Sequence, residues 1–204
     1  MTEQTKPAKK KEKGGMTEFE TGLIGSLISG LEGSVYFEVG CRNGASFAIF
    51  GRSMPPGSLL LGVDMPGGPW GMVGSETHLE KVADTLRLDY RVELLYRDSQ
   101  KPETLAEVKT VLDGQPVDAL LLDADHSRAG VVSDLEMYSP LVRPGGIVIF
   151  HDCGFLGSPL CLEKEYKLEQ VEHINTIHHI FASFCYRRKY VLVQDFVGMG
   201  AVWM

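Results

Sequence analysis

The sequence lacks several features that define large classes of protein. It has no apolar stretch long enough for a signal peptide or a membrane span, so we expect a cytoplasmic protein without membrane contacts. It has only four cysteines, none spaced as C-x-x-C, which argues against a zinc ribbon or a dithiol redox motif and predicts reduced thiols. It also lacks the G-x-G-x-x-G fingerprint of dinucleotide-binding loops and the Gly-Lys-Ser/Thr of a P-loop.

Positive charge is scarce over most of the chain. The net charge is −7, yet residues 1–15 contain five lysines and only two glutamates, so the acidic excess lies in residues 16–204. This balance argues against nucleic acid as a main ligand. Residues 1–15 have no aromatic or large aliphatic residue after Met1, which predicts a disordered basic tail. The remaining residues suit a single domain.

The chain alternates between strand-like and helix-like patterns. Uninterrupted aliphatic runs are typical of strands buried on both faces of a parallel sheet. We expect strands at residues 35–39, 58–63, 91–96, 117–122, 147–150, 190–194 and 200–204. We expect helices at residues 18–31, 45–52, 76–88, 104–112, 127–139 and, with an interruption, 163–187.

These elements predict an α/β fold with a Rossmann-like seven-stranded sheet and helices on both faces. The sheet should be mostly parallel. The last two strands are too close in sequence for a parallel crossover, so they should form a C-terminal antiparallel hairpin. We further expect Ser75 to cap the helix that follows it, and residues 143–146 to form a turn before the fifth strand.

Ionisable residues follow directly after two of the expected strands. They are Asp123, Asp125, His126, His151 and Asp152. In open α/β sheets, ligands bind beyond the carboxyl ends of the strands, so these side chains should gather at one edge. Carboxylates and imidazoles at such an edge can hold a divalent metal and move a proton. The pattern therefore predicts an enzyme.

A glycine-containing loop follows the first strand, with the sequence EVGCRNGAS at residues 38–46. Glycines let the backbone approach a ligand, and the following helix offers free N–H groups. A simple tight turn is the alternative interpretation of its G-x-x-x-G spacing. At the next strand end, Asp64 can accept hydrogen bonds from ribose hydroxyls. Asp98 and Ser99, at the third strand end, can hydrogen-bond an adenine, although such residues are also common in turns.

Together these segments resemble class I S-adenosylmethionine-dependent methyltransferases. The resemblance rests on the loop at residues 38–46, on Asp64, and on DADHS at 123–127 followed by DLEMYSPLVRPGG at 134–146. It is closest to the metal-dependent macrolide-sugar and rhamnosyl O-methyltransferases and the cephalosporin-hydroxylase-like proteins. It implies methyl transfer to a hydroxyl of a small molecule, namely a sugar, polyol or aromatic compound. It also implies a lid over residues 153–190 and a homo-oligomer formed through helix 18–31.

The resemblance assigns roles to individual residues. It implies cofactor contacts from Glu38, Gly40, Gly44, Ser46, Asp64, Asp98, Ser99 and Asp123. It implies a metal held by Asp123, His151 and Asp152, although the family commonly has a carboxylate where this chain has His151. Mg²⁺ prefers oxygen ligands, whereas imidazole suits zinc, iron or nickel. Either His151 binds a softer metal, or Mg²⁺ binds without it, or no metal binds.

His126 matches the general base of the sugar methyltransferases, which makes His126 and Asp123 the expected catalytic residues. A purely structural role for His126 at a helix N-terminus is the alternative. Two other functions stay open at this point. One is a catalytically silent S-adenosylmethionine-binding regulator or partner protein. The other is a nicotinamide-dependent oxidoreductase, which the missing G-x-G-x-x-G disfavours.

Overall fold

A computed structural model describes residues 16–68, 73–154, 168–193 and 197–204 of the chain. The expected basic tail at residues 1–15 and the central part of the expected lid, residues 155–167, lie outside the described residues. None of the helices in the described part is long and apolar enough to cross a membrane. The three cysteines described are buried free thiols: Cys41, Cys153 and Cys185.

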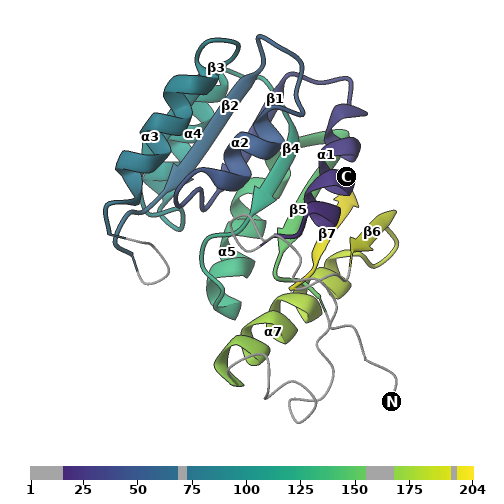
Figure 1. Cartoon of the computed structure of the whole chain (residues 1–204). Helices are drawn as coiled ribbons and strands as arrows, with labels where there is room; N and C mark the ends of the chain where they lie inside the picture. The colour runs from purple at the N-terminus through teal and green to yellow at the C-terminus, as the bar shows by residue number, and fades with distance from the viewer. Residues whose placement is uncertain (1–15, 69–72, 155–167, 194–196) are drawn as a thin grey trace, which may run out of the picture.

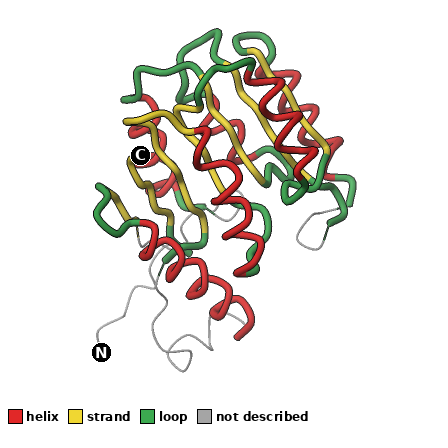
Figure 2. Tube along the Cα trace, turned by 180° about the vertical axis from the view of Figure 1, so that it is seen from behind, coloured by secondary structure: helices red, strands yellow, loops and turns green. Residues whose placement is uncertain are grey.

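The described strands form one seven-stranded sheet (Figures 1 and 2). They are β1 (Val35–Val39), β2 (Leu59–Asp64), β3 (Arg91–Tyr96), β4 (Val117–Leu122), β5 (Val142–His151), β6 (Tyr190–Val193) and β7 (Met199–Trp203). Their order is β3-β2-β1-β4-β5-β7-β6. β1 to β5 pair in parallel, whereas β7 is antiparallel to both β5 and β6. The predicted fold class is confirmed.

Helices cover both faces of the sheet (Figure 1). The helices of one face are α1 (Glu18–Ser29), α2 (Ala45–Gly51) and α3 (Ser75–Leu86), which share one apolar core with it. Those of the other are α4 (Pro102–Leu112), α5 (Arg128–Tyr138) and α7 (Leu168–Phe184), with the short 3₁₀ helix η1 (Ser139–Leu141) after α5. The central strands β1, β2 and β4 are buried along their whole length, as their aliphatic runs predicted.

Local hydrogen bonds fix where several helices begin. α1 starts with a capping box, in which Thr17 and Glu20 exchange side-chain and backbone hydrogen bonds. Ser127 caps α5, because its hydroxyl accepts a hydrogen bond from the Gly130 N–H at 3.0 Å. The prediction that Ser75 caps α3 is wrong. Gly74, with a φ of 78°, precedes the helix, and Ser75 is its first residue.

The fifth strand is longer than predicted. β5 already begins at Val142, so residues 143–146 belong to the strand and the predicted turn is wrong. The pairing with β4 shifts register between Val117 and Ala119, which marks a bulge. A bulge admits proline and glycine without the regular ladder bonds that they would break. Arg143 is anchored there by its Nε, which lies 2.5 Å from Asp118 Oδ1.

Candidate active site

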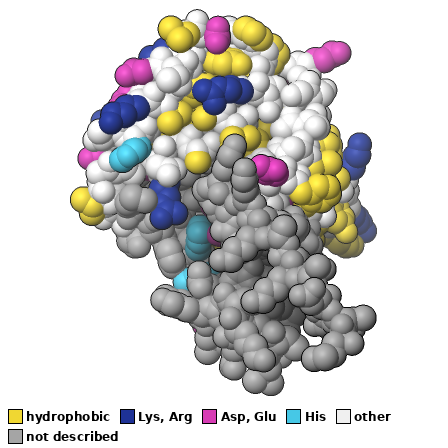
Figure 3. Space-filling model, viewed as in Figure 1, with side chains coloured by type: hydrophobic (Ala, Val, Ile, Leu, Met, Phe, Trp, Pro, Cys, Tyr) yellow, Lys and Arg dark blue, Asp and Glu magenta, His cyan; other side chains and the backbone are white. Residues whose placement is uncertain are grey.

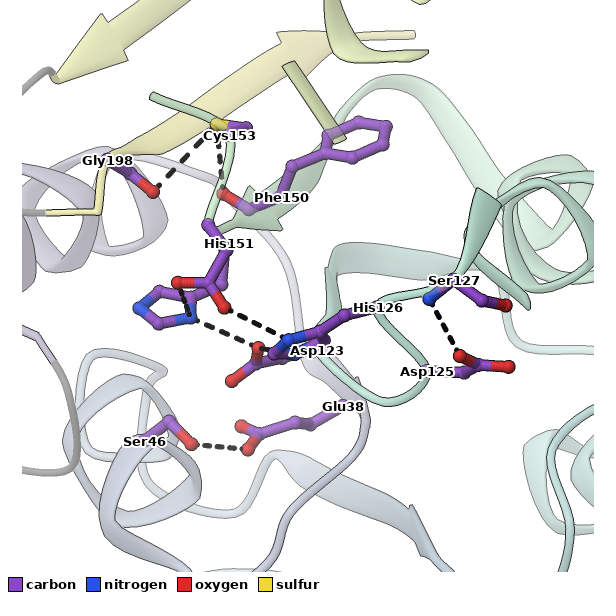
Figure 4. A network of polar contacts seen from close by, with 11 residues as sticks. Glu38, Ser46, Asp123, Asp125, His126, Ser127, Phe150, His151, Cys153 and Gly198 are labelled. Carbon is purple, nitrogen blue, oxygen red and sulfur yellow. Dashed lines mark hydrogen bonds and ion pairs between the residues drawn. The ribbon is translucent and has the colours of Figure 1, made fainter. Parts of the chain in front are cut away.

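The carboxyl ends of the parallel strands bring most of the predicted site residues to one edge of the sheet. Figure 4 shows the rings of His126 and His151 close to Asp123, with Glu38 and Ser46 next to them on the α2 side. A backbone hydrogen bond of 2.9 Å from the Asp123 N–H to the Val39 carbonyl joins the ends of β4 and β1. The sheet itself therefore sets the spacing between these groups.

The glycine loop can lie against the end of β4 only because Gly40 has no side chain. Its φ is +96°, and a Cβ atom there would lie 2.3 Å from the backbone oxygen of Asp123. Gly44, with a φ of +83°, precedes α2, and a Cβ atom there would lie 3.0 Å from Leu79 of α3. Both glycines are therefore required by the conformation and close packing of the loop.

Beneath this loop lies a fully buried carboxyl group, Glu38. The Ser46 hydroxyl donates to its Oε1 at 2.5 Å, and the Tyr36 hydroxyl donates to its Oε2. Burial, reinforced by the negative charges of Asp123 and Asp64, raises the pKa of Glu38 to about 8. A cationic ligand at this place would be attracted and would favour the ionised carboxylate.

Asp64 closes β2 and has one oxygen free for a ligand. Its Oδ1 accepts a hydrogen bond of 2.8 Å from the backbone N–H of Arg42. Its Oδ2 is buried and has no hydrogen-bond partner in the described part of the chain. Burial raises the pKa of Asp64 from its usual value. An unpartnered buried carboxylate oxygen is unfavourable unless a ligand donates to it.

Asp98 and Ser99 lie at the end of β3 and are engaged in local hydrogen bonds. Asp98 Oδ1 accepts from the Gln100 N–H at 3.0 Å, and the Ser99 carbonyl accepts from the Tyr138 hydroxyl at 2.6 Å. Gln100 Nε2 donates to Asp125 Oδ2 at 2.8 Å, which links this loop to the end of β4. The structure thus places the two residues at the same edge, in the loop joined to the end of β4 through Gln100.

Two histidines and two aspartates form the centre of the site. His151 Nδ1 lies 3.1 Å from Asp123 Oδ1 and 3.3 Å from Asp152 Oδ1. His126 bridges the same carboxylates, with Nε2 3.4 Å from Asp123 Oδ1 and Nδ1 3.3 Å from Asp152 Oδ2. Asp152 holds this position with a φ of 53°, which is uncommon for a residue other than glycine.

The charges within this cluster support one another. Burial alone would lower the pKa of His151, but the charges of Asp123 and Asp152 outweigh it and hold the pKa well above its usual value. Burial likewise acts against the charged form of His126, yet its hydrogen bond to Asp123 raises its pKa. The histidines in turn outweigh burial at Asp123 and hold its pKa well below the usual value. Charged imidazoles and carboxylates therefore stabilise each other here.

Part of this cluster has the donor set of a divalent metal site. Asp123, His126 and Asp152 each offer one ligand atom, and these atoms all lie within 4.8 Å of one another. Two carboxylates and an imidazole suit several first-row divalent metals. His151, the predicted third ligand, faces the same carboxylates through Nδ1, while its Nε2 is buried without a hydrogen-bond partner among the described residues. Either imidazole is thus placed to complete the donor set.

Two acidic residues of the site were given no role in the sequence analysis. Asp134 of α5 is buried, and burial raises its pKa to about 7. It lines a small cavity with Asp125, His126 and Ile177. Glu76, in the first turn of α3, has a buried Oε2 without a partner in the described part of the chain. The sequence does contain one signal for both residues. Each belongs to a helix that follows a strand with an acidic residue at its end.

Comparisons with known proteins bear on the family and on the fold. A family model described as a methyltransferase domain matches residues 37–153. The structure of an O-methyltransferase from Bacillus cereus in complex with SAH has a TM-score of 0.62 at 14% identity, covering 93% of this chain and 82% of that one. TomG from Streptomyces achromogenes, an O-methyltransferase involved in tomaymycin synthesis and solved with SAM, also has a TM-score of 0.62 at 14% identity, covering 93% and 81%.

A third similar structure is the SAH-bound Podospora anserina methyltransferase, with a TM-score of 0.63 at 13% identity, covering 93% of this chain and 80% of that one. No curated protein matches the chain. At these identities the solved structures establish the fold, while the family model covers more than half of the sequence and includes the glycine loop and the histidine–aspartate cluster. The chain therefore belongs to the methyltransferase-domain family and is a class I S-adenosylmethionine-dependent methyltransferase.

Proposed function

We propose that this enzyme is an O-methyltransferase that methylates a hydroxyl group of a small molecule, such as a sugar, a polyol or an aromatic compound. The observation that supports this best is the cluster of His126, Asp123 and Asp152 beside the glycine loop. It combines a proton acceptor with carboxylates that orient it, which is what a weakly acidic hydroxyl needs. Two of the structural neighbours described above are O-methyltransferases.

In this proposal the chain holds S-adenosylmethionine along the carboxyl edge of the sheet. The cofactor supplies an electrophilic methyl group on a positively charged sulfur. Glu38 and Ser46 hold its methionine part together with the backbone of Gly40 and Gly44. Asp64 binds the ribose. The adenine lies toward the loop after β3, where Asp98 and Ser99 stand, and Asp123 faces the reacting end.

His126 removes the proton of the acceptor hydroxyl in its neutral form, which a metal cation bound by the carboxylates would favour, and Asp123 and Asp152 keep its ring in place. The same carboxylates, with the imidazole of His151, fit a divalent metal as ligands while His126 serves as the base. A bound metal would lower the pKa of a coordinated hydroxyl. Mg²⁺ is our first candidate, and the imidazole in the donor set makes a softer metal the second. The transfer itself depends on in-line positioning of the two substrates.

A transfer assay tests this proposal. Purified protein is incubated with methyl-labelled S-adenosylmethionine and separate sugar, polyol, catechol, amine and thiol acceptors, with chelator and with Mg²⁺, Mn²⁺, Ni²⁺ or Zn²⁺ restored. We expect label only on hydroxyl acceptors, and loss of transfer with chelator. Asp123→Asn should abolish transfer while S-adenosylhomocysteine still binds. Transfer only to amines or thiols would contradict O-methylation, and full activity in chelator would contradict metal assistance.

A further inference from the structure

Two buried carboxylate oxygens without partners in the described part of the chain lie near the end of β2, on Asp64 and on Glu76. A ribose offers two neighbouring hydroxyl donors, whereas Asp64 has committed Oδ1 to the Arg42 N–H at 2.8 Å. Its Oδ2 is buried without a partner among the described residues and is therefore the acceptor most in need of a donor. Asp64 Oδ2 is thus placed to bind one hydroxyl, and a second unpartnered carboxylate oxygen nearby would bind the other with better geometry.

Glu76 lies on the same side of the sheet as Asp64, in the first turn of α3. The helix that follows a strand begins at the carboxyl edge of the sheet, so the first turn of α3 is on the same side as the end of β2. Tyr96 is the ladder partner of Asp64, and its hydroxyl donates to Glu80 Oε1 at 2.9 Å. Glu76 precedes Glu80 by one helical turn and therefore shares its face of the helix.

The glycine loop, residues 38–46, borders the space next to Asp64 and Glu76 from the other side. A Cβ atom on Gly44 would lie 3.0 Å from Leu79 and 3.1 Å from Val82, so α3 packs directly against this loop. Glu76 Oε2 is buried and without a hydrogen-bond partner in the described part of the chain. The charge of Glu76 also contributes, after burial, to the raised pKa of Asp64, as expected for two carboxylates close together.

We propose that Asp64 and Glu76 together bind the two ribose hydroxyls of the cofactor, one free carboxylate oxygen for each hydroxyl. This inference rests on the role of Asp64 in the proposed function and adds Glu76 as a second cofactor-binding residue. It explains why two buried carboxylate oxygens lack partners, because the ligand supplies both donors. Two adjacent carboxylates would also reject a phosphorylated ribose, which restricts the site to cofactors with a free diol.

Calorimetric titration with S-adenosylhomocysteine and its 2′-deoxy and 3′-deoxy analogues tests this assignment. The proteins are the wild type, Glu76→Gln and Asp64→Asn, with Asp84→Asn as the control, since Asp84 is an exposed acid of the same helix. We expect Glu76→Gln to weaken binding of S-adenosylhomocysteine by about 10- to 100-fold, as for a hydrogen bond to a charged group. The loss should disappear for one deoxy analogue, and the loss in Asp64→Asn should disappear for the other. Asp84→Asn should bind like the wild type.

Unchanged affinity in Glu76→Gln would overturn the assignment, as would an equal loss for all three ligands, which would indicate an indirect effect. Glu76→Ala is a second variant, and thermal unfolding with each protein shows whether the fold is kept. The wild-type titration tests the cofactor role separately. No binding by the wild type would overturn the proposed function as well, whereas normal wild-type binding with no effect at Glu76 would overturn this inference alone.

Discussion

At the scale of single residues, polar atoms without partners mark the active site. Among the described residues, buried side-chain oxygens and nitrogens without a hydrogen bond occur at Asp64, Ser75, Glu76, Asp134 and His151. All five lie toward the carboxyl edge of the sheet or on helices packed there. Because an unsatisfied buried polar group is unfavourable, such a concentration indicates groups that are kept for a ligand.

His126 provides the most direct test of the catalytic assignment. We predict that His126→Ala lowers the methyl-transfer rate by about 10²–10⁴-fold, the usual contribution of a general base. Affinity for S-adenosylhomocysteine should be unchanged, because His126 faces the acceptor side in our proposal. His78→Ala, at an exposed position of α3, is the control and should keep full activity. A variant with an unchanged rate across the pH range would reduce His126 to a structural residue.

Glu38 should make the stability of the free enzyme depend on pH. Its pKa is raised by burial from 4.5 to about 8. The neutral form of this carboxyl group stabilises the folded state. The stabilisation is fully present below the pKa of the unfolded chain, 4.5, and is lost as the pH rises through the pKa of the folded chain, about 8. We therefore predict that the free energy of unfolding in urea decreases from pH 5 to pH 9, and that Glu38→Gln decreases less. Glu32→Gln, at an exposed position, should follow the wild type. Parallel curves for wild type and Glu38→Gln would contradict this.

The strand-end residues of the site could be predicted from sequence, whereas the helical ones could not. Asp64, Asp123 and Asp152 each follow an aliphatic run, and parallel pairing necessarily brings such ends to one edge. The burial of Glu76 and Asp134 depends on how α3 and α5 pack on the sheet. Their place on helices after acidic strand ends puts them near the site, but a single sequence does not show which helical side chains become buried.

At the scale of elements, the central strands were the easiest part to predict. β1, β3 and β4 have the predicted bounds, because aliphatic or alternating runs end there at polar residues or glycine. β5 was predicted too short, because the Pro-Gly-Gly segment at residues 144–146 is typical of a turn. Neighbouring chain on both sides accommodates that segment: the pairing with β4 skips it through a register shift, and Met204 exchanges backbone hydrogen bonds with Gly145 and Gly146.

The glycine loop allows a matched test of close backbone approach. Gly40 and Gly57 both have a positive φ, +96° and +85°, but a Cβ atom on Gly57 would meet open space. Gly57→Ala should therefore cost only about 1–2 kcal/mol of conformational strain. Gly40→Ala should reduce the free energy of unfolding further and abolish cofactor binding, because the backbone of Asp123 blocks the new methyl group. Equal effects in urea unfolding would show that the loop can move away from β4.

At the scale of the whole molecule, α1 presents an apolar surface outward. Its buried residues are Glu20, Ile24, Gly25 and Ile28, whereas Phe19 is 64% exposed and Leu23 is 36% exposed. The helix itself was predicted, but its apolar residues Phe19 and Leu23 face away from the sheet. Figure 3 shows hydrophobic side chains gathered on the surface in the region of this helix. An exposed apolar patch on a helix is a common site of subunit contact.

We predict that two copies of the chain associate through this surface of α1. Phe19→Glu combined with Leu23→Glu should convert a dimer into a monomer in sedimentation velocity, because the charges would be buried at the contact. Leu88→Glu changes a residue that is 84% exposed just after α3, and it should leave the assembly unchanged. A monomeric wild type at assay concentrations would contradict the prediction.

Calorimetric titration of S-adenosylhomocysteine into the wild type and Asp64→Asn tests the central claim most directly, namely that the carboxyl edge of this sheet binds the cofactor. We predict one site per chain with a micromolar Kd in the wild type and clearly weaker binding in Asp64→Asn. Binding by the wild type that is unchanged in Asp64→Asn would place the cofactor elsewhere. No binding to the wild type would contradict the account of the site as a whole.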